Sequence, residues 1–250
     1  MGNPWAMDIL VPDDYTGRCE MAGWPCDEKW AEKALKGWEK LAAEGDGKAK
    51  YAHFIRSEHW WEYVPFYSQK KYKELYGDII ENGGYGILTS PVKVNDNNDV
   101  INYLLIAAND GYPYAMVSTY NYYDFFGKEE VHKWIFNALD MGYYRAAEVL
   151  YYFHDDGSAG FNQDYSLAYY YNKLATRLGS KSMNPPKTKE PLRDENNYRL
   201  KDDDGKTLYK VFVSQEQQDA MDEKIEKFLQ RVKPNRYLDE TTHELFRKFI

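Results

Sequence analysis

The sequence predicts an all-α protein: an α/α superhelical solenoid of helix-turn-helix repeats with a small C-terminal cap of a hairpin and a helix. The first observation is a set of positions that recur in register. A small or β-branched residue is followed after seven residues by a small or apolar pair, then by a Gly, then by another small residue. The copies fall at Val100, Ala107–Ala108, Gly111 and Ala115; at Val131, Ala138–Leu139, Gly142 and Ala146; at Ala168, Ala175–Thr176, Gly179 and Met183; and at Ala34, Leu41–Ala42, Gly45 and Ala49. The second observation is the period, 31 residues from Gly111 to Gly142 and 37 from Gly142 to Gly179, which is typical of two helices per repeat.

Residues 1–27 are expected to form an irregular N-terminal arm, because Pro4, Pro12 and Pro25 interrupt any regular element. The arm holds the two cysteines, Cys19 and Cys26. Their spacing allows a disulfide that closes a small loop in an oxidising compartment, and it equally allows two free thiols.

The repeat array is predicted to run over residues 28–183. Asp27 is a candidate N-cap for a helix that reaches Ala43, and Gly45 can adopt the left-handed conformation that ends a helix. Further helices are expected over 48–63 and 68–81, followed at 87–98 by a short extended piece and a polar turn. Gly45 and Gly111 lie 66 residues apart, about twice the later period, so the irregular insertion at about 53–98 is interpreted as one degenerate or interrupted repeat.

From residue 99 the periodicity predicts helices over about 99–109, 113–126, 129–140, 144–154 and 164–177. The recurring alanines are the small side chains that two closely packed helices need where their backbones approach. Residues 184–250 are predicted to cap the array. They comprise a Pro-rich loop, a β-hairpin within 198–213 turning at Asp204-Gly205, a helix that starts after Ser214, and a short final helix at about 239–249.

At its clearest the repeat resembles the Sel-one-like repeat, a tetratricopeptide-type helical hairpin. The matching positions are Gly160, Phe161, Asp164, Ala168, Tyr171, Ala175 and Gly179. The resemblance covers residues 30–52 and 99–183, and it departs from the family pattern in the Val at 100 and 131 and throughout 53–98. It implies a protein that binds a partner protein on a concave helical surface. Short exported bacterial members include immunity proteins that neutralise toxins of the type VI secretion system, particularly lipases, and other members are adaptors.

The charge balance, 32 basic against 40 acidic side chains, gives a net charge of −8, so no nucleic acid partner is expected. No apolar run is long enough to span a membrane, and no signal peptide is visible. Because Met1-Gly2 can stand where a signal was removed, a bridged Cys19–Cys26 pair would favour the periplasm, with the cytoplasm as the alternative.

No catalytic residue, metal site or cofactor is predicted. His53 and His59 are six residues apart, which on a helix puts them on different faces. His154-Asp155-Asp156 is interpreted as a turn after a repeat helix, although it supplies a third hypothesis, a hydrolase. The acidic stretches at 95–99 and 202–205 are interpreted as solvated turns rather than calcium loops. The chain carries no phosphate-binding loop and no nucleophile elbow.

Aromatic residues are the candidates for binding, because Tyr and Trp dominate protein–protein hot spots. Consecutive rings on a helix cannot all face the core. We expect Trp61, Tyr122 and Tyr152 to be exposed and, with Trp60, to contact the partner, and we expect Tyr123 and Phe153 to lie in the core. The leading hypothesis for that partner is a cognate bacterial toxin, and the alternative is a peptide or regulatory protein held by an adaptor.

Overall fold

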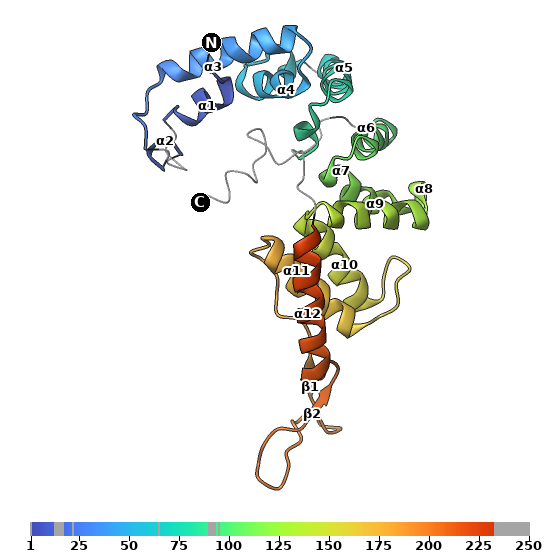
Figure 1. Ribbon diagram of the computed structural model, residues 1–250. Coiled ribbons are helices and arrows are strands. Elements are labelled where there is room, and N and C mark those ends of the chain that lie inside the picture. The colour runs from blue at the N-terminus through green and yellow to red at the C-terminus, as the bar shows by residue number, and fades with distance from the viewer. Residues whose placement is uncertain are drawn as a thin grey trace. The chain divides into compact units, whose positions relative to one another are not determined.

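The computed structural model describes residues 2–12, 18–21, 23–64, 66–89, 94 and 96–232 (Figure 1). The predicted all-α class is confirmed, since the only regular sheet among these residues has two short strands. The chain forms two compact units, with the boundary between Ala115 and Met116. The final helix predicted at about 239–249 lies outside the described residues.

The first unit is a succession of helices in which each packs on the next. Helix α1 packs on α3, α3 on α4, α4 on α5 and α5 on α6. The elements are α1 (Pro4–Ile9), α2 (Arg18–Met21), α3 (Lys29–Ala43), α4 (Gly47–Arg56), the 3-10 turn η1 (Trp60–Tyr63), α5 (Tyr67–Glu81), the 3-10 turn η2 (Tyr85–Thr89) and α6 (Asn97–Asn109).

The second unit continues in the same way, with α9 packed on α10, α10 on α11 and α11 on α12. Its elements are α7 (Pro113–Ser118), in which the boundary falls, the 3-10 turn η3 (Thr119–Tyr122), α8 (Tyr123–Phe126), α9 (Lys128–Asp140), α10 (Tyr144–Asp156), α11 (Tyr165–Leu178), β1 (Lys189–Pro191), β2 (Tyr209–Val211) and α12 (Gln215–Arg231).

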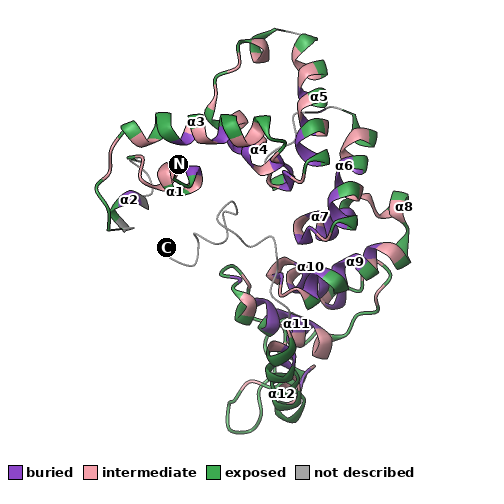
Figure 2. Ribbon diagram, turned by 45° about the horizontal axis from the view of Figure 1, so that its top comes forward, coloured by how far each residue is buried: buried purple, intermediate pink, exposed green. Residues whose placement is uncertain are grey.

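The recurring residues of the sequence pattern form the contacts between paired helices. Buried residues lie on the sides where helices of one unit meet, as α9 and α10 show in Figure 2. The fully or almost fully buried markers are Ala34, Ala49, Ala107, Ala108, Ala115, Val131, Ala138, Leu139, Ala146, Ala168 and Ala175. The small side chains therefore serve the close helix packing for which the sequence predicted them.

The glycines of the pattern end the first helix of each pair in the same way. Gly111 has a φ of 88° and Gly142 a φ of 79°, a conformation that costs L-residues energy and glycine little. The residue after each Gly donates its backbone N–H to the carbonyl five residues back in this motif, as Tyr143 does to Ala138 at 3.1 Å. The same bond recurs after Gly45, Gly111 and Gly179.

The degenerate repeat expected between Gly45 and Gly111 is centred on α5. Gly83 has a φ of 82°, and Gly84 donates its N–H to Ile79 at 2.8 Å, which repeats the cap of the other copies. Here Ile79 and Ile80, both fully buried, replace the small pair. The second helix of this copy is reduced to the 3-10 turn η2, where the sequence had predicted an extended piece.

Two predicted helices are shorter than expected. The helix placed at 48–63 ends at Arg56, and Ser57 is extended, with a ψ of 147°. The helix placed at 113–126 is divided into α7, η3 and α8. Its division has a local cause: the Thr119 hydroxyl donates to the Met116 carbonyl at 2.7 Å, and such side-chain bonds compete with the helical pattern.

The N-terminal segment is more regular than predicted. Asn3 caps α1 by accepting the backbone N–H of Trp5 at 2.9 Å, and Pro4 occupies the first turn, where its missing N–H costs nothing. Trp5 packs edge-on against Trp38 of α3, with ring centroids 6.3 Å apart. Cys19 and Cys26 form a disulfide, with their Cα atoms 5.4 Å apart.

Residues 189–211, which we call the β arm, carry both strands. Strand β1 pairs antiparallel with β2, so the partner of 209–211 is a segment that the sequence had assigned to a loop. Within the arm, backbone N–H groups form a closed cycle of hydrogen bonds: Leu192 donates to Leu208, Leu208 to Leu200, and Leu200 to Leu192, each at 2.9 Å. The predicted turn at Asp204-Gly205 is present, with Gly205 at a φ of 78°.

Candidate protein-binding site

Four exposed aromatic residues lie within residues 60–67 of the first unit, from η1 to the first residue of α5. They are Trp60 (71% exposed), Tyr63 (86%), Phe66 (94%) and Tyr67 (40%), and we call them the aromatic cluster. The rings of Trp60 and Tyr67 are stacked with centroids 5.9 Å apart. Single exposed apolar residues are ordinary, but a contiguous set of large exposed rings is a feature of interaction surfaces.

Phe66 adds backbone strain to this exposure. Its φ of 64° and ψ of −36° place a bulky L-residue in a region that such residues rarely occupy. Strain of this kind costs about 1–3 kcal/mol, and it persists mostly at functional sites. A ring that is 94% exposed does not offset that cost by packing within the chain.

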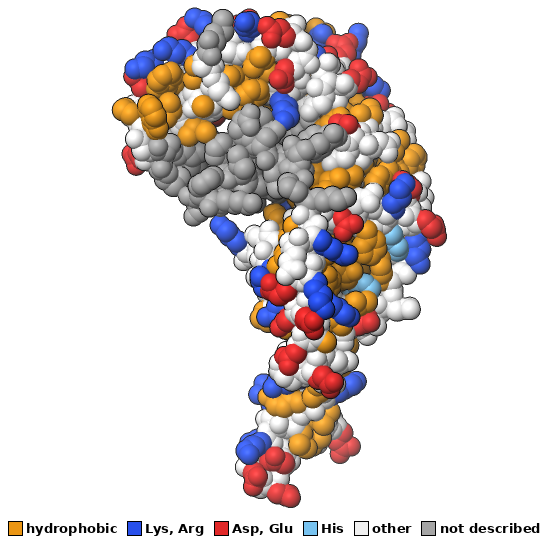
Figure 3. Space-filling model, in the orientation of Figure 1, with side chains coloured by type: hydrophobic (Ala, Val, Ile, Leu, Met, Phe, Trp, Pro, Cys, Tyr) orange, Lys and Arg blue, Asp and Glu red, His pale blue; other side chains and the backbone are white. Residues whose placement is uncertain are grey.

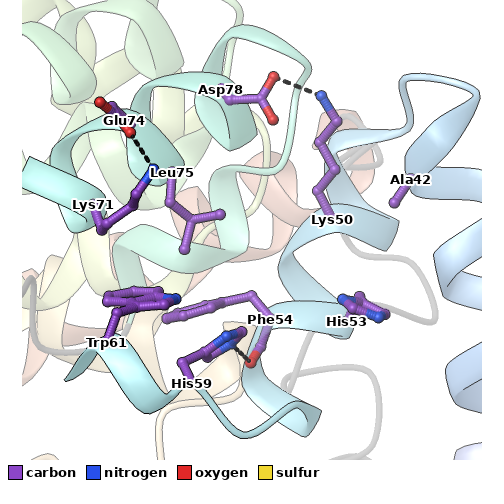
Figure 4. A pocket seen from close by; sticks show the side chains of 10 residues that line it. All are labelled: Ala42, Lys50, His53, Phe54, His59, Trp61, Lys71, Glu74, Leu75 and Asp78. Carbon is purple, nitrogen blue, oxygen red and sulfur yellow. Dashed lines mark hydrogen bonds and ion pairs between the residues drawn. The ribbon is translucent and has the colours of Figure 1, made fainter. Parts of the chain in front are cut away.

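A pocket of about 440 Å³ lies beside the aromatic cluster, between α4, η1 and α5 (Figure 4). Its lining residues are Ala42, Lys50, His53, Phe54, His59, Trp61, Lys71, Glu74, Leu75 and Asp78. The pocket exists because α4 ends at Arg56. The chain then runs through an extended turn, which places η1 beside α5 and leaves the rings of Phe54 and Trp61 facing Leu75.

The floor of the pocket is aromatic. The rings of Phe54 and His59 are stacked at 4.9 Å, and those of His59 and Trp61 lie 5.2 Å apart. Trp61 and Phe54 both meet the ring of Tyr72 edge-on, at 4.9 and 6.4 Å. Since His59 Nε2 also lies 3.0 Å from the Phe54 carbonyl oxygen, the floor is held in place by contacts within the chain.

The rim of the pocket is charged. Lys50 Nζ donates to Asp78 Oδ1 at 2.6 Å, and Lys71 Nζ donates to Glu74 Oε2 at 2.9 Å. The hydrogen bond from Lys71 lowers the pKa of the Glu74 carboxyl and raises the pKa of the Lys71 ammonium. The Glu74 carboxylate is therefore ionised at neutral pH. Asp78 and Glu74 each already have a lysine beside them.

The structure divides the predicted binding residues between the two units. Trp60 is exposed as a member of the aromatic cluster, whereas Trp61 is half-buried in the pocket floor, contrary to its expected exposure. Its partial burial follows from the contact with Tyr72. The ion pairs at the rim were not singled out in the sequence, although Lys71 and Glu74 have the spacing of a helical pair.

In the second unit Tyr152 is 54% exposed, as predicted, but Tyr122 in η3 is half-buried, which corrects its expected exposure. The short 3-10 turn, absent from the prediction, sets the direction of that ring. Phe153 lies in the core as expected. Tyr123 is half-buried, and its hydroxyl donates to the Ala159 carbonyl at 2.9 Å.

The segment proposed for a hydrolase offers no open site. His154 belongs to the last turn of α10 rather than to a loop and is 7% exposed, and its ring stacks on Tyr171 at 5.5 Å. Burial lowers the pKa of His154 and raises the pKa of the Asp155 carboxyl. Among the described residues no group of three His, Cys, Asp or Glu side chains is placed to hold a metal ion.

The β arm presents a second set of exposed apolar side chains, visible as an orange band in the part of the second unit that carries β1 and β2 (Figure 3). Its members include Leu192, Leu200, Leu208, Tyr198 and Val211. Asp194 and Asp202, at the same position of each turn, accept backbone N–H groups and so hold the two turns of the arm.

No family model matches the chain, and no curated protein is significantly similar to it. A Sel1 repeat protein from Oxalobacter formigenes, known from its crystal structure, is 19% identical with a TM-score of 0.46, over 63% of this chain and 68% of that one. The assignment to the α-solenoid class therefore stands on the paired helices and repeated caps described above. No helix in the described part of the chain has the length and apolar character needed to cross a bilayer.

Proposed function

We propose that this chain is a non-enzymatic repeat protein that binds a protein partner through the aromatic cluster and the pocket beside it. The observation that carries the proposal is Phe66, whose ring is 94% exposed on a strained backbone at a φ of 64°. The neighbouring Trp60 and Tyr63 supply the large, rigid rings that anchor protein interfaces.

We further propose that the partner is a secreted bacterial toxin and that this chain neutralises it, as the resemblance to Sel-one-like immunity proteins implies. The disulfide between Cys19 and Cys26 supports a periplasmic location after signal removal, because such bonds persist in oxidising compartments. An adaptor that holds a peptide or regulatory protein at the same cluster is the second candidate, favoured by the pocket of about 440 Å³.

The test is co-purification of the chain with the toxin encoded beside it, together with protection of cells that express that toxin. Trp60→Ala and Tyr63→Ala are expected to weaken binding by about 2 kcal/mol each, as anchoring aromatic residues do. Trp24→Ala is the matched control, since Trp24 is equally exposed (67%) but lies outside the cluster. Absence of both binding and protection would refute the immunity proposal, and binding without protection would favour the adaptor.

A further inference from the structure

We propose that the pocket between α4, η1 and α5 receives one uncharged aromatic side chain, a Trp, Tyr or Phe, from the partner protein. This inference rests on the proposed function and specifies what the partner must present. The volume of the pocket, about 440 Å³, lies in the usual range for binding pockets, so the pocket can contain an indole ring.

The first argument is the shape of the pocket. Figure 4 shows the rings of Trp61 and Phe54 side by side, with Leu75 across the opening from them. A flat floor opposite an aliphatic side chain is complementary to a flat ring. Because contacts with Tyr72 and His59 already fix the floor, binding costs little rearrangement. Aromatic rings gain additional stabilisation from offset or edge-on contact with other rings, which an aromatic floor can supply.

The second argument is the charge at the rim. Two lysines and two carboxylates already neutralise each other, and the ammonium of Lys50, with a side chain only 18% exposed, is strongly held by Asp78. An entering cation would have to compete with Lys50 and Lys71 for the carboxylates. An entering anion would have to compete with Asp78 and Glu74 for the lysines. An uncharged ring leaves both pairs intact, and a phenol or indole tip can still donate a hydrogen bond to a half-exposed carboxylate.

The experiment uses the full chain and three capped amino acids as probes: N-acetyl-tryptophanamide, N-acetyl-tyrosinamide and N-acetyl-argininamide. Their binding is followed by NMR through the ring protons of His53 and His59 and the indole N–H of Trp61. The two aromatic probes are expected to shift these signals with millimolar affinity, as single side chains do. The argininamide is expected to bind at least about tenfold more weakly. If it binds more tightly than the aromatic probes, the pocket is a guanidinium site and the proposal is overturned.

Two variants fill the pocket from different helices: Leu75→Phe from α5 and Ala42→Leu from α3. Each is expected to weaken binding of the aromatic probes about tenfold or more, provided that circular dichroism shows an intact helical fold. Trp24→Ala, which alters an exposed Trp elsewhere, is expected to leave the probe affinity unchanged. Unchanged probe affinity in a folded filling variant overturns the proposal.

The same variants separate this inference from the proposed function. A partner that binds Leu75→Phe and Ala42→Leu as tightly as the native chain, yet loses affinity for Trp60→Ala, refutes the pocket inference and leaves the proposed function standing. If no protein partner binds the native chain, the proposed function fails. In that case the pocket inference is judged by the probes alone. If the aromatic probes shift no NMR signals of the pocket, the inference is overturned; if they shift these signals and the argininamide does not, the specificity of the pocket for aromatic side chains is supported.

Discussion

Phe66 combines two properties that do not stabilise the free protein, a left-handed φ of 64° and an almost fully exposed ring. Glycine occupies this backbone region at little cost, whereas an L-residue is strained by about 1–3 kcal/mol. Mutation of Phe66 should therefore separate the contribution of the ring to partner binding from the cost of the strained backbone to stability.

We expect Phe66→Gly to be more stable than Phe66→Ala by about 1 kcal/mol, because only glycine relieves the strain. Both variants remove the ring and should weaken partner binding equally. Denaturant midpoints and binding affinities of the two variants provide the measurement. If Phe66→Gly is the less stable of the two, the backbone at this residue is not strained.

His154 is a buried titratable group in the packing between α10 and α11. Burial lowers its pKa, so the folded state favours the neutral imidazole more than the unfolded chain does. The stability that this supplies is fully present above the unfolded pKa, about 6.5, and is lost as the pH falls through the lowered folded value.

We therefore expect the free energy of unfolding to decrease as the pH falls below about 6.5, the pKa of a histidine in the unfolded chain. In His154→Phe this part of the decrease should be absent, because a neutral ring of similar size replaces the imidazole. Urea denaturation at closely spaced pH values measures it. Identical pH profiles for the native chain and the variant would show that His154 is not linked to folding.

At the scale of elements, the most demanding contact is between the start of α4 and the turn after α5. A Cβ on Gly84 would lie 2.2 Å from the carbonyl oxygen of Gly47, and a Cβ on Gly47 would lie 2.3 Å from that of Asn82. Gly47 also donates its backbone N–H to Asn82 at 3.1 Å. The two elements therefore approach so closely that neither position admits a side chain.

Gly83 and Gly84 form a matched pair for mutation. Gly83→Ala places a methyl group in open space and should cost about 1–2 kcal/mol through its φ of 82° alone. Gly84→Ala meets backbone atoms on the other element and should cost more, about 3 kcal/mol or above, because the helices must separate. Thermal unfolding measures the loss of stability in each variant. An equal loss in the two variants would contradict the close approach of α4 and the turn after α5.

The regular part of the array was predictable because its signals are local. A glycine after a small pair specifies a helix end and the close packing of the next helix, so Ala138, Gly142 and Ala146 could be interpreted from sequence alone. The copy around Gly83 was harder to recognise, since Ile79 and Ile80 replace the small pair and the second helix is reduced to the 3-10 turn η2.

Other features depend on contacts between distant residues. The pairing of 189–191 with 209–211 joins segments on either side of two turns, whereas the sequence suggested a hairpin of adjacent strands. The eight-residue spacing of Leu192, Leu200 and Leu208 is visible in the sequence. The structure explains it, because the backbone groups of these three residues form a closed cycle of hydrogen bonds. The pocket likewise joins Ala42 to Asp78, and no local pattern marks it.

At the scale of the whole molecule, the net charge of −8 acts on any partner before contact is made. Long-range attraction between an acidic protein and a basic partner accelerates encounter, and salt screens it over about 8–10 Å at physiological ionic strength. The aromatic cluster acts only at contact, because its interactions are short-ranged. The two effects therefore influence different rate constants.

For the co-purified partner, we expect the association rate constant to fall about tenfold when NaCl is raised from about 0.05 M to about 0.5 M, because screening removes the long-range attraction. The dissociation rate constant should change little over the same range. Tyr63→Ala should do the opposite: it should raise the dissociation rate and leave the salt dependence of association as in the native chain, because Tyr63 is uncharged and 86% exposed within the cluster. Both rate constants are measured by surface plasmon resonance, with one protein immobilised, at several salt concentrations. If association is independent of salt, the acidic surface has no part in capture. Recognition would then depend on the rings alone.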